Sequence, residues 1–409
     1  MKTISSITRL IVALIPLLAS NAPAQTTAPA KTPAGYVIGV LQATPAHIAT
    51  DYKAGVRLAT LEVAWSSFEP GPDQVDDRYA ADIKARLALF RAAHMLVQLD
   101  LGIQYPPQWI KDLPNARYIN QYGTAYIDRT PGKDVVNPVF NQLIRDREAD
   151  YVARVFHVLG PDFYAVRLGW QYFGELGYPG AGFEGKENCY WGYDALAQGN
   201  NREFLPPGIG PCPVPGWIPG TPSTGHLSAK RFAEWYLSAL ANCQAWEIQT
   251  VRHYYQGKLP VLYGSWGIRA GVADKEIAAD LGDKQQTEMQ RGYDLDRLVT
   301  SIADPNVLPY TTWIDSNPSF GDDTKPDAKR WCPAHYLADR AASHPLKLTV
   351  WGENTGRGDG AALELSLRRM RDYRLLGLVW AFEGDLYESS HKYASILDMD
   401  RAVKSLTND

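Results

Sequence analysis

Eight continuous apolar runs of seven to ten residues recur along the chain, most of them preceded by a helical pattern. They are Tyr36–Gln42, Arg57–Trp65, Met95–Ile103, Tyr164–Phe173, Leu259–Gly267, Val307–Asp315, Leu346–Asn354 and Leu375–Phe382. Apolar runs of this kind between helices are typical of parallel strands that are buried on both faces. Eight strands and seven helical segments predict an α/β fold, a closed (β/α)₈ TIM barrel. The alternative, a doubly wound open sheet, usually has fewer strands, and no GxGxxG motif follows the first run.

The N-terminus has the pattern of an export signal. Lys2 and Arg9 precede the short apolar stretch LIVALIPLLA, and NAPAQ supplies a small-residue cleavage site. The apolar stretch is too short to span a bilayer, which takes ~20 residues, and it fits a secretory signal peptide. We therefore expect residues 1–24 to be a signal peptide, 25–34 a flexible leader and 35–409 a single (β/α)₈ catalytic domain of a secreted or periplasmic protein.

Composition excludes some partners and favours others. The net charge of the 409 residues is −4, so the chain has no basic footprint for nucleic acid. Twelve Trp and 23 Tyr suit a core, and they also suit stacking on flat apolar faces such as those of sugar rings. No CxxC or HExxH spacing occurs, so we expect no metal site and no cofactor.

The four cysteines are candidates for disulfide bonds, because exported proteins can hold them. Four cysteines allow three pairings, and sequence alone does not choose among them. Cys189 and Cys212 bracket one Gly/Pro-rich stretch, so we favour that pair as a loop crosslink, and the pairing of Cys243 and Cys332 stays open.

Carboxylates at the ends of two apolar runs indicate where a site would lie. Active sites of (β/α)₈ barrels lie at the C-terminal ends of the strands. Glu175 ends the fourth run and Glu353 the seventh. A Gly/Pro-rich insertion from Gly177 to about Thr224 follows Glu175, and it is far longer than an ordinary connection. We expect it to form one wall of the cleft, with Tyr190, Trp191 and Trp217 as candidate sugar platforms at its surface.

Two carboxyl groups on opposite sides of a glycosidic bond are the usual requirement for its cleavage. Glu175 is the candidate general acid, or acid/base, and its apolar context WQYFGE predicts a raised pKa. Glu353 is the candidate nucleophile, or the base of an inverting enzyme, and its context WGENTGR suits an ionised group. The insertion would form a closed pocket, and a closed pocket favours exo action.

Three motifs resemble known glycosidase families. EVAWSSFEPGPDQVD (Glu62–Asp76) resembles the strand-two segment of family 42 β-galactosidases, and YPPQWIKDLPNARYINQYG (Tyr105–Gly123) is similar to their Pro-Pro-x-Trp stretch. GELGYPG resembles a segment of family 14 β-amylases whose Glu is the general acid. The resemblance implies a TIM-barrel glycoside hydrolase with Glu175 and Glu353 as its carboxylates. The strand-four and strand-seven placement implies retention.

One position departs from the retaining families. They have Asn before the acid/base Glu, whereas this chain has Gly174, as do the inverting β-amylases. Inversion therefore stays open as an alternative, as does a carbohydrate-binding barrel without turnover.

Eight further side chains are candidate substrate-binding residues because of their places on the runs. They are Arg57, Trp65, Trp109, Tyr310, Trp313, Asn354, Trp380 and Glu383. Arg57 is expected to hydrogen-bond Glu353 and hold it ionised. Trp380 resembles the platform beneath the sugar in the retaining families. The expected partner is an oligosaccharide, polysaccharide or glycoside, with no nucleic acid and no membrane span.

Overall fold

The computed structural model describes residues 35–284, 287–316, 324–390 and 392–406. The predicted signal peptide and leader, residues 1–24 and 25–34, lie outside the described residues. Among the residues that are described, no helix is long and apolar enough to cross a membrane.

Each of the eight apolar runs contains a strand. The strands are β1 (Val37–Val40), β2 (Leu58–Glu62), β3 (Leu96–Asp100), β4 (Ala165–Val166), β5 (Leu259–Tyr263), β6 (Val307–Thr311), β7 (Trp351–Gly352) and β8 (Gly377–Trp380). Every pairing between them is parallel. The predicted eight-strand parallel α/β architecture is thus confirmed.

The hydrogen-bonded ladder is not continuous, in contrast to the regular closed barrel that we expected. It forms two sheets, with strand orders β4-β3-β2-β1-β8 and β5-β6-β7. Isolated parallel bridges, Leu168 with Val261 and Glu353 with Val379, lie at the two junctions between the sheets. The first junction is irregular because Gly169 has a φ of 102°, which ends the extended chain of β4. The chain pairs with β5 again at Leu176, whose N–H donates to Leu262.

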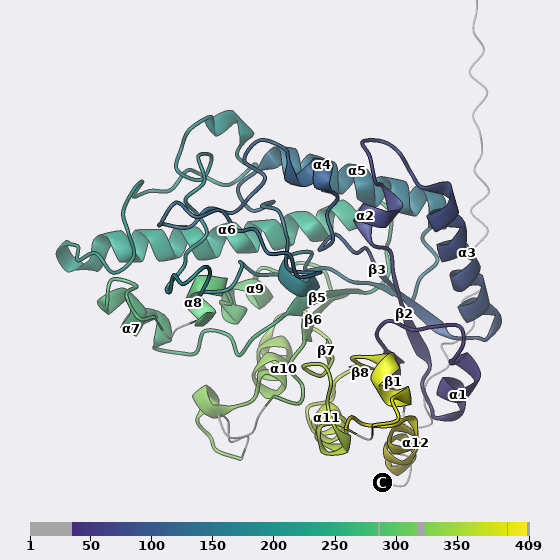
Figure 1. The fold of residues 1–409 in the computed structure, drawn as a ribbon. Coiled ribbons are helices and arrows are strands. Elements are labelled where there is room, and N and C mark those ends of the chain that lie inside the picture. The colour runs from purple at the N-terminus through teal and green to yellow at the C-terminus, as the bar shows by residue number, and fades with distance from the viewer. Residues whose placement is uncertain (1–34, 285–286, 317–323, 391, 407–409) are drawn as a thin grey trace, which may run out of the picture.

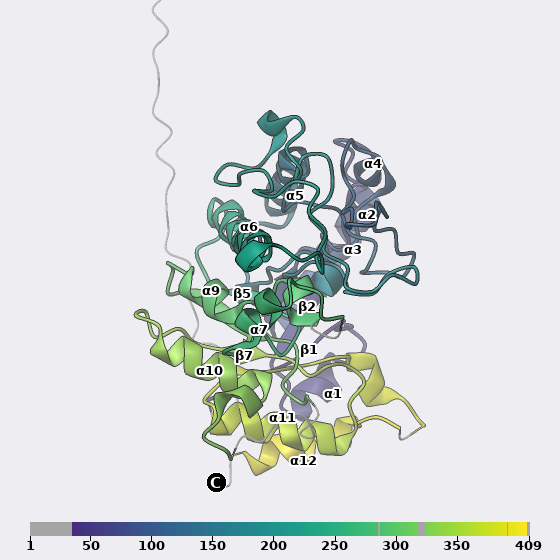
Figure 2. The ribbon, with the colours of Figure 1, turned by 90° about the vertical axis from the view of Figure 1, so that its left-hand side faces the viewer.

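Twelve α-helices are present in the described part of the chain. They are α1 (Ile48–Lys53), α2 (Trp65–Phe68), α3 (Asp77–Ala92), α4 (Gln108–Lys111), α5 (Gln142–Leu159), α6 (Leu227–Arg252), α7 (Val272–Ala278), α8 (Thr287–Arg291), α9 (Leu295–Thr300), α10 (Pro333–Ser343), α11 (Gly360–Asp372) and α12 (Ile396–Ser405). Helices α5 and α6 lie side by side on one side of the strands, and α10, α11 and α12 lie on the other (Figures 1 and 2).

Side-chain caps define where several of these helices begin. The Asp76 carboxylate accepts from the backbone N–H of Tyr79 at the start of α3. Ser395 and Asp398 form a reciprocal capping box at the start of α12. Such caps satisfy backbone N–H groups that have no partner inside the helix, and each contributes about 1 kcal/mol.

The buried apolar residues form two clusters. The larger one lies between the strands and the helices and includes Leu378 and Trp380 of β8. The smaller one brings together residues from β1, β2, β4, β5, β6, β7 and β8, including Tyr310, Trp351 and Val379. Side chains of a strand alternate between its faces, so the smaller cluster is the interior that the strands enclose.

The insertion after β4 has no α-helix or strand between Glu175 and His226, only the 3₁₀ turns η2 (Arg202–Phe204) and η3 (Thr224–His226). Aromatic rings attach it to α6: the Tyr178 ring stacks on Tyr236 at 3.9 Å. Trp191 and Tyr190 are buried, so they pack the insertion and are not available as the sugar platforms that we predicted.

The predicted disulfide between Cys189 and Cys212 is absent, and neither Cys243 nor Cys332 forms one in the described structure. Cys189 instead accepts from the amide of Asn120, and its backbone N–H donates to Ala181. The backbone N–H of Cys212 donates to Ala197. Each cysteine at an end of the stretch therefore has its own hydrogen-bond partners. Although Cys189 and Cys212 flank the same stretch, their sulfur atoms are not bonded to each other.

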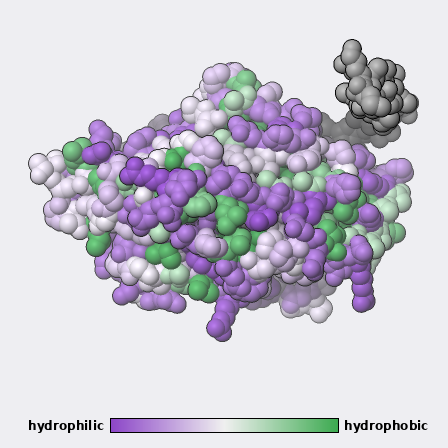
Figure 3. Space-filling model, turned by 90° about the horizontal axis from the view of Figure 1, so that it is seen from above, coloured by the Kyte–Doolittle hydropathy of each residue, from purple (hydrophilic) through white to green (hydrophobic). Residues whose placement is uncertain are grey.

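The molecular surface is mixed in character. Seen from the side on which α4 and α5 lie, hydrophobic residues form small separate groups among hydrophilic ones (Figure 3). Single exposed apolar residues are normal on protein surfaces, so only those beside a functional site need a specific explanation.

Candidate active site

Glu175 lies at the end of the segment that follows β4, directly after the 3₁₀ turn η1 (Tyr172–Gly174). Its Oε1 accepts a 2.7 Å hydrogen bond from the Thr312 hydroxyl, and its Oε2 lies 3.2 Å from Nη2 of Arg291. The apolar surroundings that the sequence predicted for Glu175 are therefore not found. A hydroxyl and a guanidinium hold its carboxylate in one orientation.

Gly264, directly after β5, makes room for this carboxylate. A Cβ atom built on Gly264 would lie 1.7 Å from Oε2 of Glu175, far inside any van der Waals contact. The main-chain oxygen of Gly264 also accepts a 3.0 Å hydrogen bond from Arg291. Only glycine at this position allows Glu175 and Arg291 their observed places.

Glu353 follows β7 and is buried. Its carboxylate accepts a 2.9 Å hydrogen bond from the Tyr310 hydroxyl and lies 3.2 Å from Nη1 of Arg167. Burial raises the pKa of Glu353; Arg167 and Tyr310 oppose that rise, and the charge of Glu175 adds to it.

Strand β6 relates the two carboxylates in space. Tyr310 donates to Glu353, and Thr312, two residues further on, donates to Glu175. Tyr310 lies in β6 and Thr312 is the first residue after that strand. Two acids from distant parts of the sequence are thus held by two residues at the end of one strand.

Further charged groups join Glu353 on its other side. Nε of Arg167 lies 3.6 Å from the carboxylate of Asp100, which pairs in register with Glu62 of the neighbouring strand. Burial, and then the charge of Asp100, raise the pKa of Glu62 to about 7, while a hydrogen bond from the Tyr105 hydroxyl lowers it. The ends of β2, β3, β4 and β7 therefore contribute to one polar group around a single arginine.

Arg57 is not part of this group, which corrects the prediction that it holds Glu353 ionised. It begins β2 and so lies at the opposite end of the strand from Glu62. Its guanidinium donates to the main-chain oxygens of Tyr52 and Val56 and stacks on the Tyr52 ring at 3.8 Å. Arg167 supplies the cation instead.

Two tryptophans predicted to bind substrate are core residues. Trp65 is fully buried, stacks on Tyr151 and donates to the Glu69 carboxylate. Trp380 is fully buried in the outer cluster, where its ring lies against Gly358. In β8 it is Val379, not Trp380, that faces the interior. Both residues are therefore excluded as sugar platforms in this structure.

Asn354 and Glu383 have partners within the protein, from the main chain and, for Glu383, from the His47 side chain. The amide of Asn354 donates to the oxygen of Ala381 and accepts from its N–H, which joins the ends of β7 and β8. The carboxylate of Glu383 is buried, accepts from the N–H of Thr44 and lies 2.9 Å from Nδ1 of His47. Both positions connect strand ends, in contrast to the substrate contacts that we predicted.

The other predicted aromatics have mixed outcomes. Tyr310 is fully buried and donates to Glu353, so in this structure it holds a carboxylate. Trp109 is half-buried and donates to the main-chain oxygen of Glu69 at 3.3 Å, and Trp313, directly after Thr312, is half-buried. Their contact with a substrate stays a prediction.

Four residues of the site were missed by the reasoning from sequence: Glu62, Arg167, Arg291 and Thr312. A signal existed for two of them, because Glu62 and Arg167 are the charged residues of otherwise apolar runs. A charge inside such a run must find a partner in the protein interior. Arg291 and Thr312 carried no comparable signal.

Glu247 of α6 supports the segment that carries Glu175. Its buried Oε2 accepts a 2.7 Å hydrogen bond from the N–H of Gly169. Burial raises its pKa from 4.5 to about 7, although hydrogen bonds to that segment oppose the rise. A carboxyl group with a raised pKa stabilises the fold most below pH 4.5, and this contribution is lost as the pH rises through about 7.

We therefore expect the stability of the Glu247→Gln variant, relative to the wild type, to improve between pH 4.5 and pH 8. Urea unfolding across this range measures it. Glu234→Gln, in the same helix, is the matched control: Arg297 lowers the pKa of Glu234, so its effect changes below pH 4.5 and stays level above it. A pH-independent difference between Glu247→Gln and the wild type would contradict the prediction.

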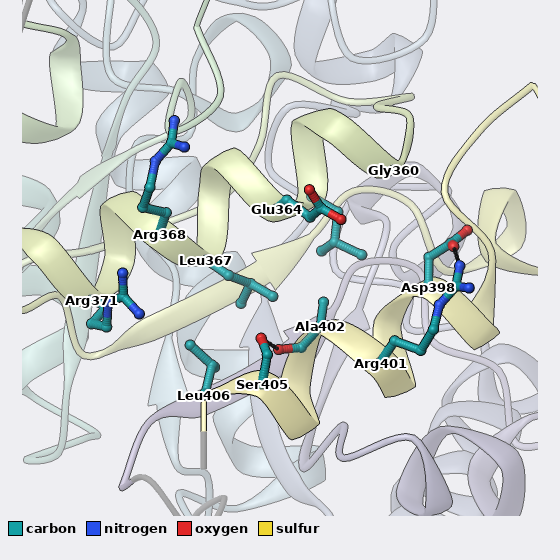
Figure 4. A pocket seen from close by; sticks show the side chains of 11 residues that line it. Gly360, Glu364, Leu367, Arg368, Arg371, Asp398, Arg401, Ala402, Ser405 and Leu406 are labelled. Atoms are coloured by element: carbon teal, nitrogen blue, oxygen red, sulfur yellow. Dashed lines mark hydrogen bonds and ion pairs between the residues drawn. The ribbon is translucent and has the colours of Figure 1, made fainter. Parts of the chain in front are cut away.

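A separate pocket lies between α11 and α12 (Figure 4). The charged and polar side chains at its edges come from both helices: Glu364, Arg368, Arg371, Asp398, Arg401 and Ser405. The pocket shares no residue with the carboxylate site. In the described part of the chain, no group of three or more His, Cys, Asp or Glu side chains is placed to hold a metal ion.

Comparison with known proteins shows the fold. The catalytic domain of the β-amylase from Paenibacillus polymyxa superposes with a TM-score of 0.65 at 15% identity, over 91% of this chain and 98% of that one. β-Galactosidases from Marinomonas ef1 and Bacillus circulans superpose with TM-scores of 0.55 at 12% and 11% identity. The alignments cover 91% of this chain and 59% and 56% of those chains, so this chain spans little more than half their length.

No family model matches the sequence, and no curated protein is similar to it. The evidence from comparison is therefore structural. It establishes that the chain has the parallel α/β architecture of TIM-barrel glycosidases.

Proposed function

We propose that this protein is a glycoside hydrolase that uses Glu175 and Glu353 to cleave an O-glycosidic bond. One observation carries the proposal: Glu175, after the turn that follows β4, and Glu353, directly after β7, are held by Thr312 and Tyr310, which lie two residues apart at the end of β6. This is the pair of acids that glycosidic cleavage needs, at the strand ends where barrel enzymes have their sites. The structural likeness to β-amylase and β-galactosidases supports the same class of reaction.

In the proposed cycle, Glu175 donates a proton to the leaving oxygen while Glu353 attacks the anomeric carbon. Arg167 and the Tyr310 hydroxyl favour the ionised, nucleophilic form of Glu353 against its burial. Once Glu353 is esterified its negative charge is gone, so Glu175 and Arg291 are left as a pair of opposite charges. Glu175 can then remain ionised and accept a proton from the incoming water, whose oxygen bonds the anomeric carbon as the bond from that carbon to Glu353 breaks.

We propose retention of configuration because the acids follow strands four and seven. The β-amylase likeness over 98% of that chain keeps inversion as the alternative. Proton NMR of the first product formed from aryl glycosides and oligosaccharides decides between them. A product with the same anomeric configuration as the substrate supports retention, and a product with the opposite configuration supports inversion. Binding without cleavage of any compound would reject the proposal that the protein is an enzyme.

Two further parts of the proposal concern access and location. The insertion that follows Glu175 supports exo action on a chain end. The basic start, the apolar stretch and the cleavage pattern of residues 1–24 support export to the periplasm or medium. Mass spectrometry of the mature N-terminus in the producing cell tests the second part: we expect it at Gln25.

Gly264→Ala tests the position of the Glu175 carboxylate. The added methyl would lie 1.7 Å from Oε2, so the side chain must turn away from Arg291 and Thr312. We expect kcat/KM to fall about 100-fold, because a misplacement near 1 Å costs that much. Gly384→Ala is the control, since a Cβ there meets no atom within 4 Å. Equal rates for both variants would show that the observed place of Glu175 is unimportant.

A further inference from the structure

Phe173 is an exposed aromatic residue two positions before Glu175. Its relative exposure is 49%, whereas the nearby Tyr105 and Tyr172 are half-buried. Its ring meets the Tyr172 ring edge-on at 4.8 Å, and Nζ of Lys133 lies 5.1 Å from its centre. A large apolar ring beside a polar site is unusual enough to need an explanation.

The backbone at Phe173 makes its presence more unusual. Phe173 has φ 59° and ψ 23°, and Gly174 follows with φ 74°. Two consecutive left-handed residues turn the chain back, so that the N–H of Glu175 faces the oxygen of Tyr172 at 3.2 Å. Glycine would adopt this conformation at position 173 without strain, and a bulky residue there is an outlier. Neither the turn nor the core requires a phenyl ring, and an outlier of this kind motivates a functional hypothesis.

Phe173 lies beside a pocket through its contact with Gly132. Its N–H donates to the oxygen of Gly132 at 2.7 Å, and a Cβ on Gly132 would meet the Phe173 ring at 3.3 Å and the Tyr105 ring at 3.7 Å. Gly132 and Tyr105 line the pocket together with Gln104 and Gln108, whereas Phe173 is not among its lining residues. The Tyr105 hydroxyl also bonds the carboxylate of Glu62. The Phe173 ring is therefore next to a pocket whose lining reaches Glu62.

We propose that Phe173 is a binding platform for the sugar ring on the leaving-group side of the cleaved bond. The inference rests on the proposed function, because the acid that protonates the leaving oxygen defines that side. The C–H face of a pyranose is apolar and stacks on an aromatic ring, while its hydroxyls need polar partners such as Gln104, Gln108 and Lys133. The substrate class is therefore an oligosaccharide with a sugar, not a small alcohol, as leaving group.

Binding to the Glu175→Gln protein tests the platform independently of turnover. Calorimetry is run with trisaccharides of α-1,4-glucose, β-1,4-glucose and β-1,4-galactose, and with the matching monosaccharides. Adding Phe173→Gly is expected to weaken the best trisaccharide about 10-fold, to leave the monosaccharide unchanged and to leave the melting temperature equal or higher. Phe173→Tyr should restore binding. Phe204→Ala, at an equally exposed Phe on η2, is the matched control.

Kinetics then separates the two proposals. In the protein with an intact Glu175, Phe173→Gly should lower kcat/KM for the trisaccharide about 10-fold but not for the glycosyl fluoride, whose leaving group has no ring. Equal trisaccharide affinity with and without the Phe173 ring, or no trisaccharide binding at all, would overturn the platform. Trisaccharide binding that needs Phe173, with no cleavage of any substrate, would overturn the hydrolase and keep the platform.

Discussion

Glu353→Gln is expected to lose about 10³-fold or more in kcat/KM on every substrate, including glycosyl fluorides. Its amide cannot attack the anomeric carbon or activate water, and no other side chain takes its place between Tyr310 and Arg167. A missing acid or base costs about 10²–10⁴ in rate. Initial rates with a natural oligosaccharide and with the fluoride of the same sugar measure the effect.

Glu175→Gln should differ in a way that reports its role. Loss of the acid should cost about 10³-fold on an oligosaccharide, whose leaving oxygen needs a proton, and far less on the fluoride. Glu383→Gln is a matched control, since that buried carboxylate also follows a strand but bonds Thr44 and His47. A near-normal oligosaccharide rate in Glu175→Gln or in Glu353→Gln rejects the role assigned to that residue. Equal losses of Glu175→Gln on the oligosaccharide and on the fluoride reject the acid role of Glu175.

Arg167→Met is expected to lower both the stability and the rate. It leaves the carboxylates of Glu353 and Asp100 near each other without their shared cation. Removing one partner of a buried ion pair typically costs 3–5 kcal/mol of unfolding free energy. The pKa of Glu353, already raised by burial, should rise further, so less of the nucleophile is ionised at neutral pH.

The pH dependence of stability and of kcat/KM distinguishes the loss of the Arg167 charge from simple unfolding of the variant. A further rise in a folded-state pKa gives stability that is present at low pH and lost as the pH rises, so Arg167→Met should be destabilised more at pH 8 than at pH 5. The acid limb of kcat/KM should move to higher pH. Arg57→Met is the control, because Arg57 bonds only main-chain oxygens in the described contacts. An unshifted acid limb in a folded Arg167→Met protein would contradict the role.

The strands were predictable because burial on both faces leaves a plain mark in the sequence. Each of the eight apolar runs contains a parallel strand; Glu353 directly follows β7, whereas Glu175 lies nine residues after the end of β4. A continuous apolar run does not show which side chains of the strand point to the interior, because the residues of both faces are apolar. Trp380 was therefore assigned to the interior, although Val379 occupies it.

Contacts between distant elements were not predictable in the same way. Whether Arg57 or Arg167 reaches Glu353 depends on which end of its strand each occupies, and the run boundaries do not fix this. The positions of Arg291 and Thr312 depend on how loops fold over the strand ends. The disulfide prediction was wrong for a related reason, because the positions of two cysteines at the ends of a stretch of chain do not fix the distance between their sulfur atoms. The run pattern thus predicted the parallel strands, whereas the partners of Glu175 and Glu353 depend on tertiary geometry.

The stacking of Tyr178 on Tyr236 bears on how ligands enter. If the insertion borders the cleft as we propose, the buried aromatic rings that fasten it to a long helix make it a fixed wall and not a gate. Entry and exit would then proceed without an opening step, and the width of the mouth alone would decide which chains are admitted. Solvent viscosity should in that case slow encounter but leave the maximal turnover untouched.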